Sequence, residues 1–152
     1  VIDRLAEGGD PDRFPFARPQ MSDGSLDFSF SGFKTAGLRL IRKLGLTRSH
    51  ADFLDFIASF EGAVIRSLLH NLEQALNEYD PKSLILCGGV ARNKKLRARF
   101  LELAARQGVP GYIPSPELCT DNAAMVAALA HEKLAREPAR KLDLTLNAYP
   151  RR

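Results

Sequence analysis

The chain has 152 residues, 45% of them hydrophobic and 26% charged, with a formal net charge of +4. This length suits one domain with a buried core, and the mild basic excess permits contact with nucleic acid without requiring it. The longest apolar runs are about five residues, far below the roughly 20 of a membrane helix, and no signal segment opens the chain, so we expect no membrane association.

Cysteine content points to a compartment. Only Cys87 and Cys119 are present, and a chain of this size needs no disulfide. Free thiols are typical of a reducing environment, so the sequence indicates a cytoplasmic protein. The chain opens at Val1 on a sequence typical of the interior of a fold, so we expect a piece of a larger protein.

The first third of the chain is expected to hold an irregular segment and one helix. Residues 10–27 are rich in Pro, Gly, Asp and Ser, which predicts a surface excursion. Alternating apolar and polar side chains over residues 26–30 favour a short strand or arm. A helix is predicted over about residues 32–43, and Gly45 is expected to end it.

The centre of the chain carries the strongest helical signal. Apolar side chains recur every three or four residues over about residues 50–79, which predicts a long helix that Asp80-Pro81 ends. Residues 83–87 form an apolar run too short for a helix and are followed by glycines. A buried strand is therefore predicted there.

The last part of the chain is predicted to complete a β-α-β unit. A second amphipathic helix spans about residues 92–107, and a short strand follows near residues 111–113. A third helix runs over about residues 123–136. Residues 137–152 are predicted to form a polar tail.

The turn after the predicted strand is a candidate phosphate site. Gly88 and Gly89 would leave backbone amides at a helix start with no Cβ in the way of a phosphate. Asn93 lies in the first turn of that helix, where its carboxamide can bind a ribose or the mixed anhydride of an adenylate. The alternative is that the glycines only make a tight turn and Asn93 only caps the helix.

A second candidate site lies just before the last helix. The Asp121 carboxylate can bind a hard or borderline metal, while Thr120 or Asn122 meets substrate. Alternatively, Thr120 or Asp121 caps the helix, and Cys119 is a small buried hydrophobe. The three histidines stand far apart and none has a second ligand at i+3 or i+4, so they form no metal site by themselves.

A basic cluster begins beside the glycines. It could follow an RNA backbone, although no aromatic residue interleaves to stack on a base. A solvated helix face is the alternative interpretation. The cluster consists of Arg92, Lys94, Lys95, Arg97 and Arg99.

Three segments of the chain resemble, in order and spacing, segments of the TsaD/Kae/OSGEP family, formerly called glycoproteases. They are FSFSGFKTA (28–36), LILCGGVARNKKLR (84–97) and ELCTDNAAMVAALA (117–130). The resemblance covers nearly the whole chain. It implies that residues 1–152 form the single C-terminal lobe of a two-lobed α/β protein, a helix-rich lobe of the actin-like ATPase (ribonuclease-H-like) fold.

The family's chemistry implies a function and site residues. Members transfer a threonylcarbamoyl group from its adenylate to N6 of adenosine 37 of tRNA, so the resemblance implies an acyltransferase acting on tRNA. It places the adenylate-binding asparagine on Asn93, beside Gly88 and Gly89, and the metal-binding aspartate on Asp121. The nucleotide ligand would be threonylcarbamoyl-adenylate or ATP/ADP.

The implied metal is one divalent ion, iron or zinc, shared with two histidines of an HxxxH motif in the family's N-terminal lobe. Such a metal would hold and polarise the acyl phosphate while the adenosine amine attacks. This chain contains no HxxxH motif and no evident general base, so we expect the fragment alone to be inactive.

The resemblance also implies partners. These are tRNA and, in bacteria, accessory proteins of the TsaB/TsaE type, while exposed interlobe surface could drive self-association. Two other functions remain open. The chain could be half of an actin-like-fold sugar or carboxylate kinase that uses Gly88-Gly89 for ATP phosphates, although the CTDN run argues against it, or a non-enzymatic basic RNA-binding or scaffold module.

Overall fold

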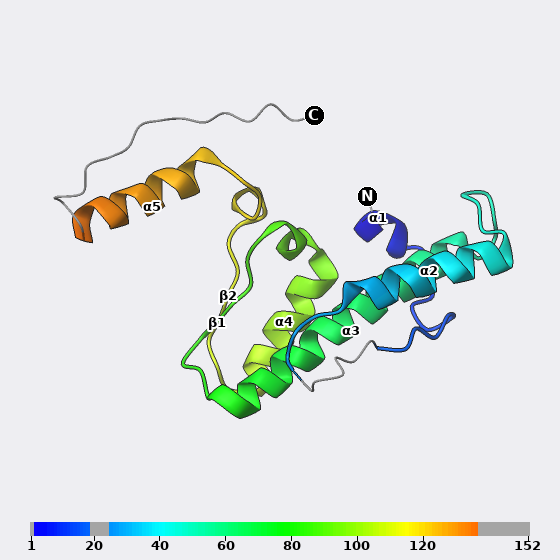
Figure 1. Cartoon of the computed structure of the whole chain (residues 1–152), viewed down its shortest axis with the longest axis horizontal. Coiled ribbons are helices and arrows are strands. Elements are labelled where there is room, and N and C mark those ends of the chain that lie inside the picture. Colours follow the sequence, from blue (N-terminus) through cyan, green and yellow to red (C-terminus); the bar gives the residue numbers. More distant parts are fainter. Residues whose placement is uncertain (1, 19–24, 137–152) are drawn as a thin grey trace.

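The computed structural model describes residues 2–18 and 25–136, a helix-rich α/β arrangement (Figure 1). The remaining positions of the predicted excursion, 19–24, and the predicted tail, 137–152, lie outside the described residues. The elements in chain order are α1 (Ile2–Ala6), α2 (Phe30–Leu44), α3 (Phe53–Tyr79), β1 (Leu84–Ile85), the 3-10 turn η1 (Gly89–Arg92), α4 (Lys94–Arg106), β2 (Gly111–Tyr112), the 3-10 turn η2 (Pro116–Leu118) and α5 (Ala123–Arg136).

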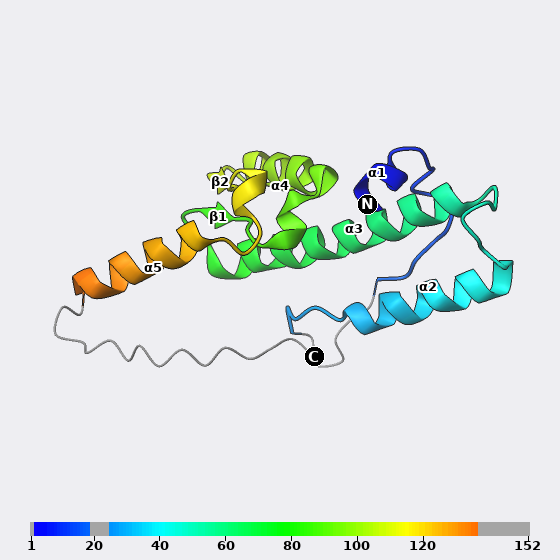
Figure 2. The same ribbon diagram turned by 90° about the horizontal axis from the view of Figure 1, so that it is seen from above.

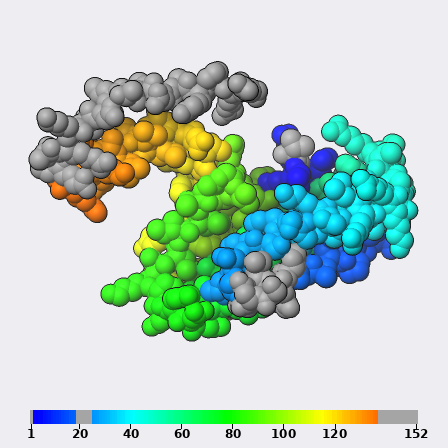
Figure 3. Space-filling model, in the orientation of Figure 1, coloured from blue at the N-terminus to red at the C-terminus, as the bar shows by residue number. Residues whose placement is uncertain are grey.

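The long helix α3 is the spine of the fold. Figure 2 shows α1 and α4 on one side of α3 and α2 on the other. α5 projects away from this body (Figure 3), and none of its residues is buried in the described part of the chain. The spine therefore places the short N-terminal helix and the start of α4 next to each other.

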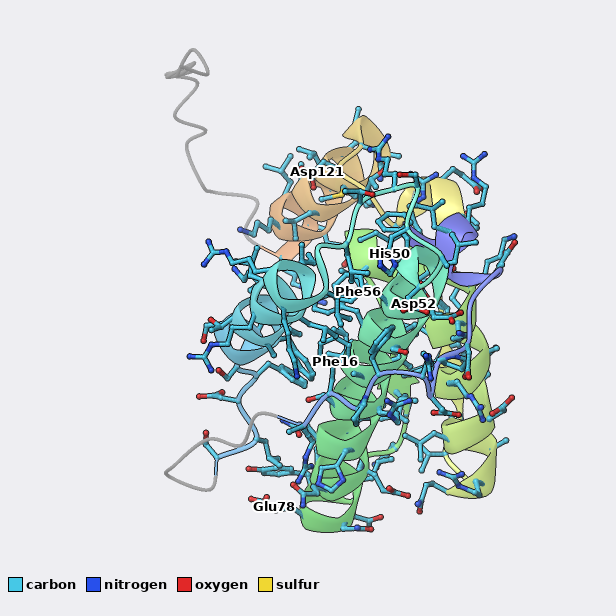
Figure 4. All side chains as sticks on the ribbon, turned by 90° about the vertical axis from the view of Figure 1, so that its right-hand side faces the viewer. Phe16, His50, Asp52, Phe56, Glu78 and Asp121 are labelled. Atoms are coloured by element: carbon cyan, nitrogen blue, oxygen red, sulfur yellow. The ribbon has the colours of Figure 1, made fainter. Side chains whose placement is uncertain are left out.

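Two hydrophobic clusters hold the other elements to α3. At its C-terminal end, Leu76 packs with Leu84 of β1 and with the buried face of α4, which includes Phe100. Nearer its start, Phe56 and Phe60 contact Phe16 edge to face at ring-centroid distances of 6.0 and 5.6 Å (Figure 4). These contacts bury the apolar stripe that predicts α3 in the sequence.

The predicted helix ends are confirmed. Gly45 follows α2 in the left-handed conformation, with φ of 59° and its amide donating to the Ile41 carbonyl. Asp80 ends α3 in the same conformation, with φ of 45°, and Pro81 follows it. Both positions stop a helix because the next turn cannot continue from a left-handed residue.

The β-α-β unit is confirmed, but the predicted buried strand is wrong in length and burial. β1 and β2 pair in parallel, with Leu84 opposite Gly111 and Ile85 opposite Tyr112. Only Leu84 is buried, while Ile85 is 69% exposed. α3 and α4 cover one face of this sheet, and alternate side chains of a strand point to opposite faces, so the second face stays open in the described part of the chain.

The strand or arm predicted over residues 26–30 is not a strand. The Asn71 side chain of α3 donates to the backbone carbonyls of Leu26 and Asp27, at 2.9 and 3.2 Å. Those carbonyls are thereby tied to a helix, and Phe30 already begins α2. The backbone here binds a side chain of α3 instead of pairing with another strand, as the alternating pattern would favour.

Gly111 is predicted to be required where β2 crosses α4. A Cβ at Gly111 would lie 2.9 Å from the Ala104 Cβ and 3.3 Å from Phe100 Cε1. We expect Gly111→Ala to lower the free energy of unfolding by about 1–3 kcal/mol, measured by urea denaturation. Gly89→Ala is the matched control, because a Cβ there meets no atom within 4 Å. Equal midpoints for the two variants would contradict this packing.

Candidate nucleotide site

A cleft of about 730 Å³ lies between α1, α3 and the start of α4. The α3 wall is mostly apolar and includes Val64 and Leu68. The polar groups that line the cleft come from three separate parts of the chain. They are Asp3, Glu61, Arg92 and Asn93, with Gly89 beside them. An apolar pocket of this size with a few polar groups is typical of a small-ligand site.

The glycine loop (residues 87–93) joins β1 to α4 at this cleft. Gly88 has φ of 86°, a conformation that favours glycine, and its carbonyl accepts from the Ala91 amide to close the 3-10 turn. No atom lies within 4 Å of a Cβ built at Gly89, so nothing in the described fold itself requires glycine there. The opening amides of a helical turn lack intrahelical partners. The backbone amide of Gly89 is therefore a candidate donor to a phosphate.

Asn93 caps α4 and also reaches across the cleft to α3. Its Oδ1 accepts from the Leu96 amide at 2.8 Å, which confirms the predicted capping role. Its Nδ2 donates to Glu61 Oε1 at 2.7 Å. A carboxamide has two N–H donors and two acceptor lone pairs, so one of each remains for a ligand.

Glu61 is a site residue that the sequence interpretation missed. It is 6% exposed, its Oε1 binds Asn93, and Lys95 Nζ lies 3.7 Å from its Oε2. A buried carboxylate needs such partners. The available signal was an acid inside the apolar stripe of the long helix, next to Phe60. Asp3, which lines the same cleft from α1, was missed as well.

Asp121 lies at the start of α5 (Figure 4), but it does not cap that helix. The Met125 amide donates to Asn122 Oδ1 at 2.9 Å, so Asn122 is the cap and the predicted cap at Thr120 or Asp121 is wrong. Asn122 fits because its carboxamide lies three residues before that amide. The Asp121 carboxylate is exposed, and the described residues offer it no hydrogen bond or ion pair.

Asp121 is suitable as one metal ligand, but the described residues do not complete a metal site around it. Among residues 2–18 and 25–136, no three His, Cys, Asp or Glu side chains gather closely enough to hold an ion. A free carboxylate offers the oxygen that a hard or borderline cation prefers. Any metal at Asp121 therefore needs ligands from outside this part of the protein.

The carboxylate loop (residues 113–122) lies beside the glycine loop. Arg97 of α4 donates to the carbonyls of Ala91 and Pro114, both at 3.0 Å. A hydrogen bond from Ser115 lowers the pKa of Glu117, as do its own backbone amide and the positive charges of Arg92 and Arg97. Both observations show that the start of α4 lies close to the loop that carries Asp121.

Cys119 confirms the interpretation of a small buried residue. It is 4% exposed, and its Sγ donates to the Ser115 carbonyl at 3.5 Å. Cys87 is exposed, and both thiols are free. None of the helices in the described part of the chain combines the length and apolar character needed to cross a membrane.

Four members of the basic cluster have partners among the described residues. Arg97 binds backbone carbonyls, whereas three lysine or arginine neighbours pair with carboxylates. These pairs are Lys94 with Glu7 at 3.3 Å, Lys95 with Glu61 at 3.7 Å and Arg99 with Glu102 at 3.1 Å. Lys94 and Arg99 are exposed, and exposed ion pairs are weak, so these pairs leave both interpretations of the cluster open.

The parallel β-α-β unit, with a glycine loop beside a cleft, places the protein in the α/β class. A family model described as "TsaD: tRNA N6-adenosine threonylcarbamoyltransferase" matches residues 1–128. The chain belongs to this family. The matched region includes both the glycine loop and Asp121.

Several curated proteins named tRNA N6-adenosine threonylcarbamoyltransferase are similar to this chain. A relative from Carboxydothermus hydrogenoformans is 44% identical over 151 residues, covering 99% of this chain and 43% of the relative. One from Geobacter sulfurreducens is 47% identical over 126 residues, covering 83% and 37%, and one from Thiobacillus denitrificans is 40% identical over 154 residues, covering 99% and 44%. The chain thus spans less than half the length of these relatives.

Proposed function

We propose that this chain forms one wall of the active site of a tRNA threonylcarbamoyltransferase. In this proposal the chain is the C-terminal lobe of an actin-like, two-lobed protein. Threonylcarbamoyl-adenylate binds at the cleft, and its acyl group passes to N6 of adenosine 37 of tRNA. The observation that carries the proposal is the family match across residues 1–128, which includes a glycine loop and an asparagine facing one cleft.

Recognition of the adenylate is assigned to groups from three elements. The backbone amides at Gly88 and Gly89 are assigned to the phosphate, and Asn93 keeps one donor and one acceptor for the anhydride or ribose. The Asp3 carboxylate lines the same cleft and is suited to accept from ribose hydroxyls. Glu61 holds the Asn93 carboxamide so that its remaining donor has a fixed direction.

Asp121 is assigned as one ligand of a divalent iron or zinc ion. The other ligands would be histidines in the part of the relatives that this chain does not match. Such an ion supplies Lewis-acid polarisation of the acyl phosphate. The role of this chain is to present an exposed carboxylate that no other described group occupies.

The proposed partners follow from the same assignment. They are tRNA as the acyl acceptor and accessory proteins of the TsaB/TsaE type, in a cytoplasmic setting, with possible self-association of the chain through exposed apolar side chains such as Val126 and Leu129. The kinase and RNA-module alternatives have less support, because the relatives are named transferases.

The test joins this chain to the preceding part of a relative and, with accessory proteins of the TsaB/TsaE type present, measures transfer of labelled threonylcarbamoyl from its adenylate to tRNA. We expect transfer by the joined protein and none by the chain alone. Asn93→Ser keeps a helix cap but removes the carboxamide, so the KM for the adenylate should rise about tenfold or more. The free energy of unfolding should fall by about 1–3 kcal/mol, because buried Glu61 loses one partner.

Asn71→Ser is the matched control for this experiment. It removes the same chemical group from α3, where Asn71 binds the backbone of Leu26 and Asp27 outside the cleft. The KM for the adenylate should stay unchanged in this variant. Equal KM values for the Asn93 and Asn71 variants would contradict the nucleotide site, and a joined protein that folds without transferring threonylcarbamoyl would contradict the function.

A further inference from the structure

Arg97 binds both of the loops that carry the proposed site residues. Its Nη1 donates to the carbonyls of Ala91 and Pro114, each at 3.0 Å, and its Nη2 donates to the Pro114 carbonyl at 3.0 Å. Cys119 Sγ lies 3.8 Å from Nη1. One guanidinium therefore joins the glycine loop to the carboxylate loop.

These contacts fix geometry instead of balancing charge. All the acceptors of Arg97 are neutral, and no carboxylate of the described residues forms an ion pair with it. A planar guanidinium holds its five donors in a rigid fork, which suits several carbonyls at once. A lysine ammonium or a neutral side chain cannot reproduce that arrangement.

The anchor points lie close to the site residues along the chain. Ala91 is fully buried and stands two residues before Asn93. Cys119 is buried and stands two residues before Asp121. Two residues of extended chain span at most roughly 7 Å, so each site residue lies within that reach of a residue that contacts Arg97.

The two loops differ in how much other support they have. Asn93 is held independently by the Leu96 amide and by Glu61. Asp121 has no such support among the described residues, since its carboxylate is unbonded and no residue of α5 is buried. Loss of Arg97 should therefore release the carboxylate loop more than the glycine loop.

We propose that Arg97 is a positioning residue, which holds the carboxylate loop against the glycine loop and thereby sets where Asp121 stands relative to Asn93. The claim that Arg97 joins the two loops does not depend on the activity of the protein. The claim that this joining affects threonylcarbamoyl transfer rests on the proposed function. Two experiments separate these claims.

The first experiment measures the reactivity of the Cys119 thiol in the full chain with Cys87→Ser, so that one cysteine remains. Arg97→Met should speed labelling of Cys119 by a water-soluble thiol reagent about tenfold or more, because the carboxylate loop opens locally. Arg99→Met is the matched control, since Arg99 lies on the same helix and, among the described residues, pairs with Glu102 alone. It should label at the unsubstituted rate.

Rescue distinguishes positioning from general loss of structure. In Arg97→Ala, free guanidinium at a non-denaturing concentration should restore slow labelling of Cys119, and in Arg99→Ala it should change nothing. If Arg97→Met does not fold, Arg97→Lys keeps the charge and the aliphatic stem and should still label faster than the unsubstituted chain. Labelling of Cys119 that stays slow in every folded Arg97 variant would overturn the proposal.

The second experiment measures transfer by the joined protein. Arg97→Met should lower kcat about 10- to 100-fold while the KM for the adenylate changes less than about threefold, because Asn93 keeps its own contacts. Arg99→Met should leave both values unchanged. An unaltered kcat in a variant whose Cys119 has become reactive would overturn the positioning role. If the unsubstituted joined protein transfers nothing, the proposed function fails while the labelling result still decides whether the loops are joined.

Discussion

Replacing Asp121 by alanine is expected to reduce threonylcarbamoyl transfer by the joined protein about 100-fold or more, because a metal site that loses a ligand loses its ion or its geometry. The free energy of unfolding should change by less than about 0.5 kcal/mol, since the carboxylate is exposed and unbonded among the described residues. Initial rates measure the transfer, metal analysis measures the bound ion per protein, and thermal unfolding measures the stability.

Glu117→Gln is the matched control for the Asp121 variant. Glu117 is an exposed acid in the same loop, and its partner is the Ser115 hydroxyl. It should retain both the transfer rate and the bound metal. If Asp121→Ala transfers at the unsubstituted rate with a full metal content, Asp121 is not a ligand.

Truncating Phe100 should destabilise the fold more than any other substitution considered for this chain. Phe100 is 2% exposed and packs with Leu76 of α3 and Leu84 of β1, so alanine leaves a cavity where three elements meet. We expect Phe100→Ala to cost about 3–5 kcal/mol of the free energy of unfolding, measured by urea denaturation of the full chain.

Leu101→Ala provides the comparison for this core substitution. Leu101 is the next residue of α4 and is 46% exposed. Its truncation should cost less than about 1 kcal/mol. Because a domain of this size has a total stability of roughly 5–15 kcal/mol, the Phe100 variant should lose a large part of it and unfold at a clearly lower urea concentration. Similar denaturation midpoints for the two variants would show that the core lies elsewhere.

Local signals were sufficient to predict four of the helices and the β-α-β unit, but not the short helix α1. The stripe that includes Phe56 and Leu76 requires a buried helix face whatever the rest of the fold does, and Gly45 and Pro81 end helices through their own backbone properties. The strand at residues 83–87 was predicted too long and too buried. An apolar run does not show whether other elements cover one face of the sheet or both.

Contacts between distant parts of the chain explain what the sequence could not show. Asn93 was identified as a cap and candidate ligand, but its bond to Glu61, 32 residues earlier, requires the packing of α4 on α3. Arg97 was grouped with a basic cluster, because nothing in its neighbours indicates that Ala91 and Pro114 offer carbonyls to it. The approach of Asp121 to Asn93 across one substrate stays a prediction.

The exposed position of α5 has a consequence for hydrogen exchange. A helix of 14 residues with no buried side chain has little more than its own backbone bonds to resist fraying, which is marginal for an isolated segment in water. Its amides should therefore exchange deuterium through opening of that segment alone, well before α3 and α4 exchange. Asp121 thus lies between the packed part of the fold and a helix that frays. How well its position is fixed therefore depends on the residues that precede it.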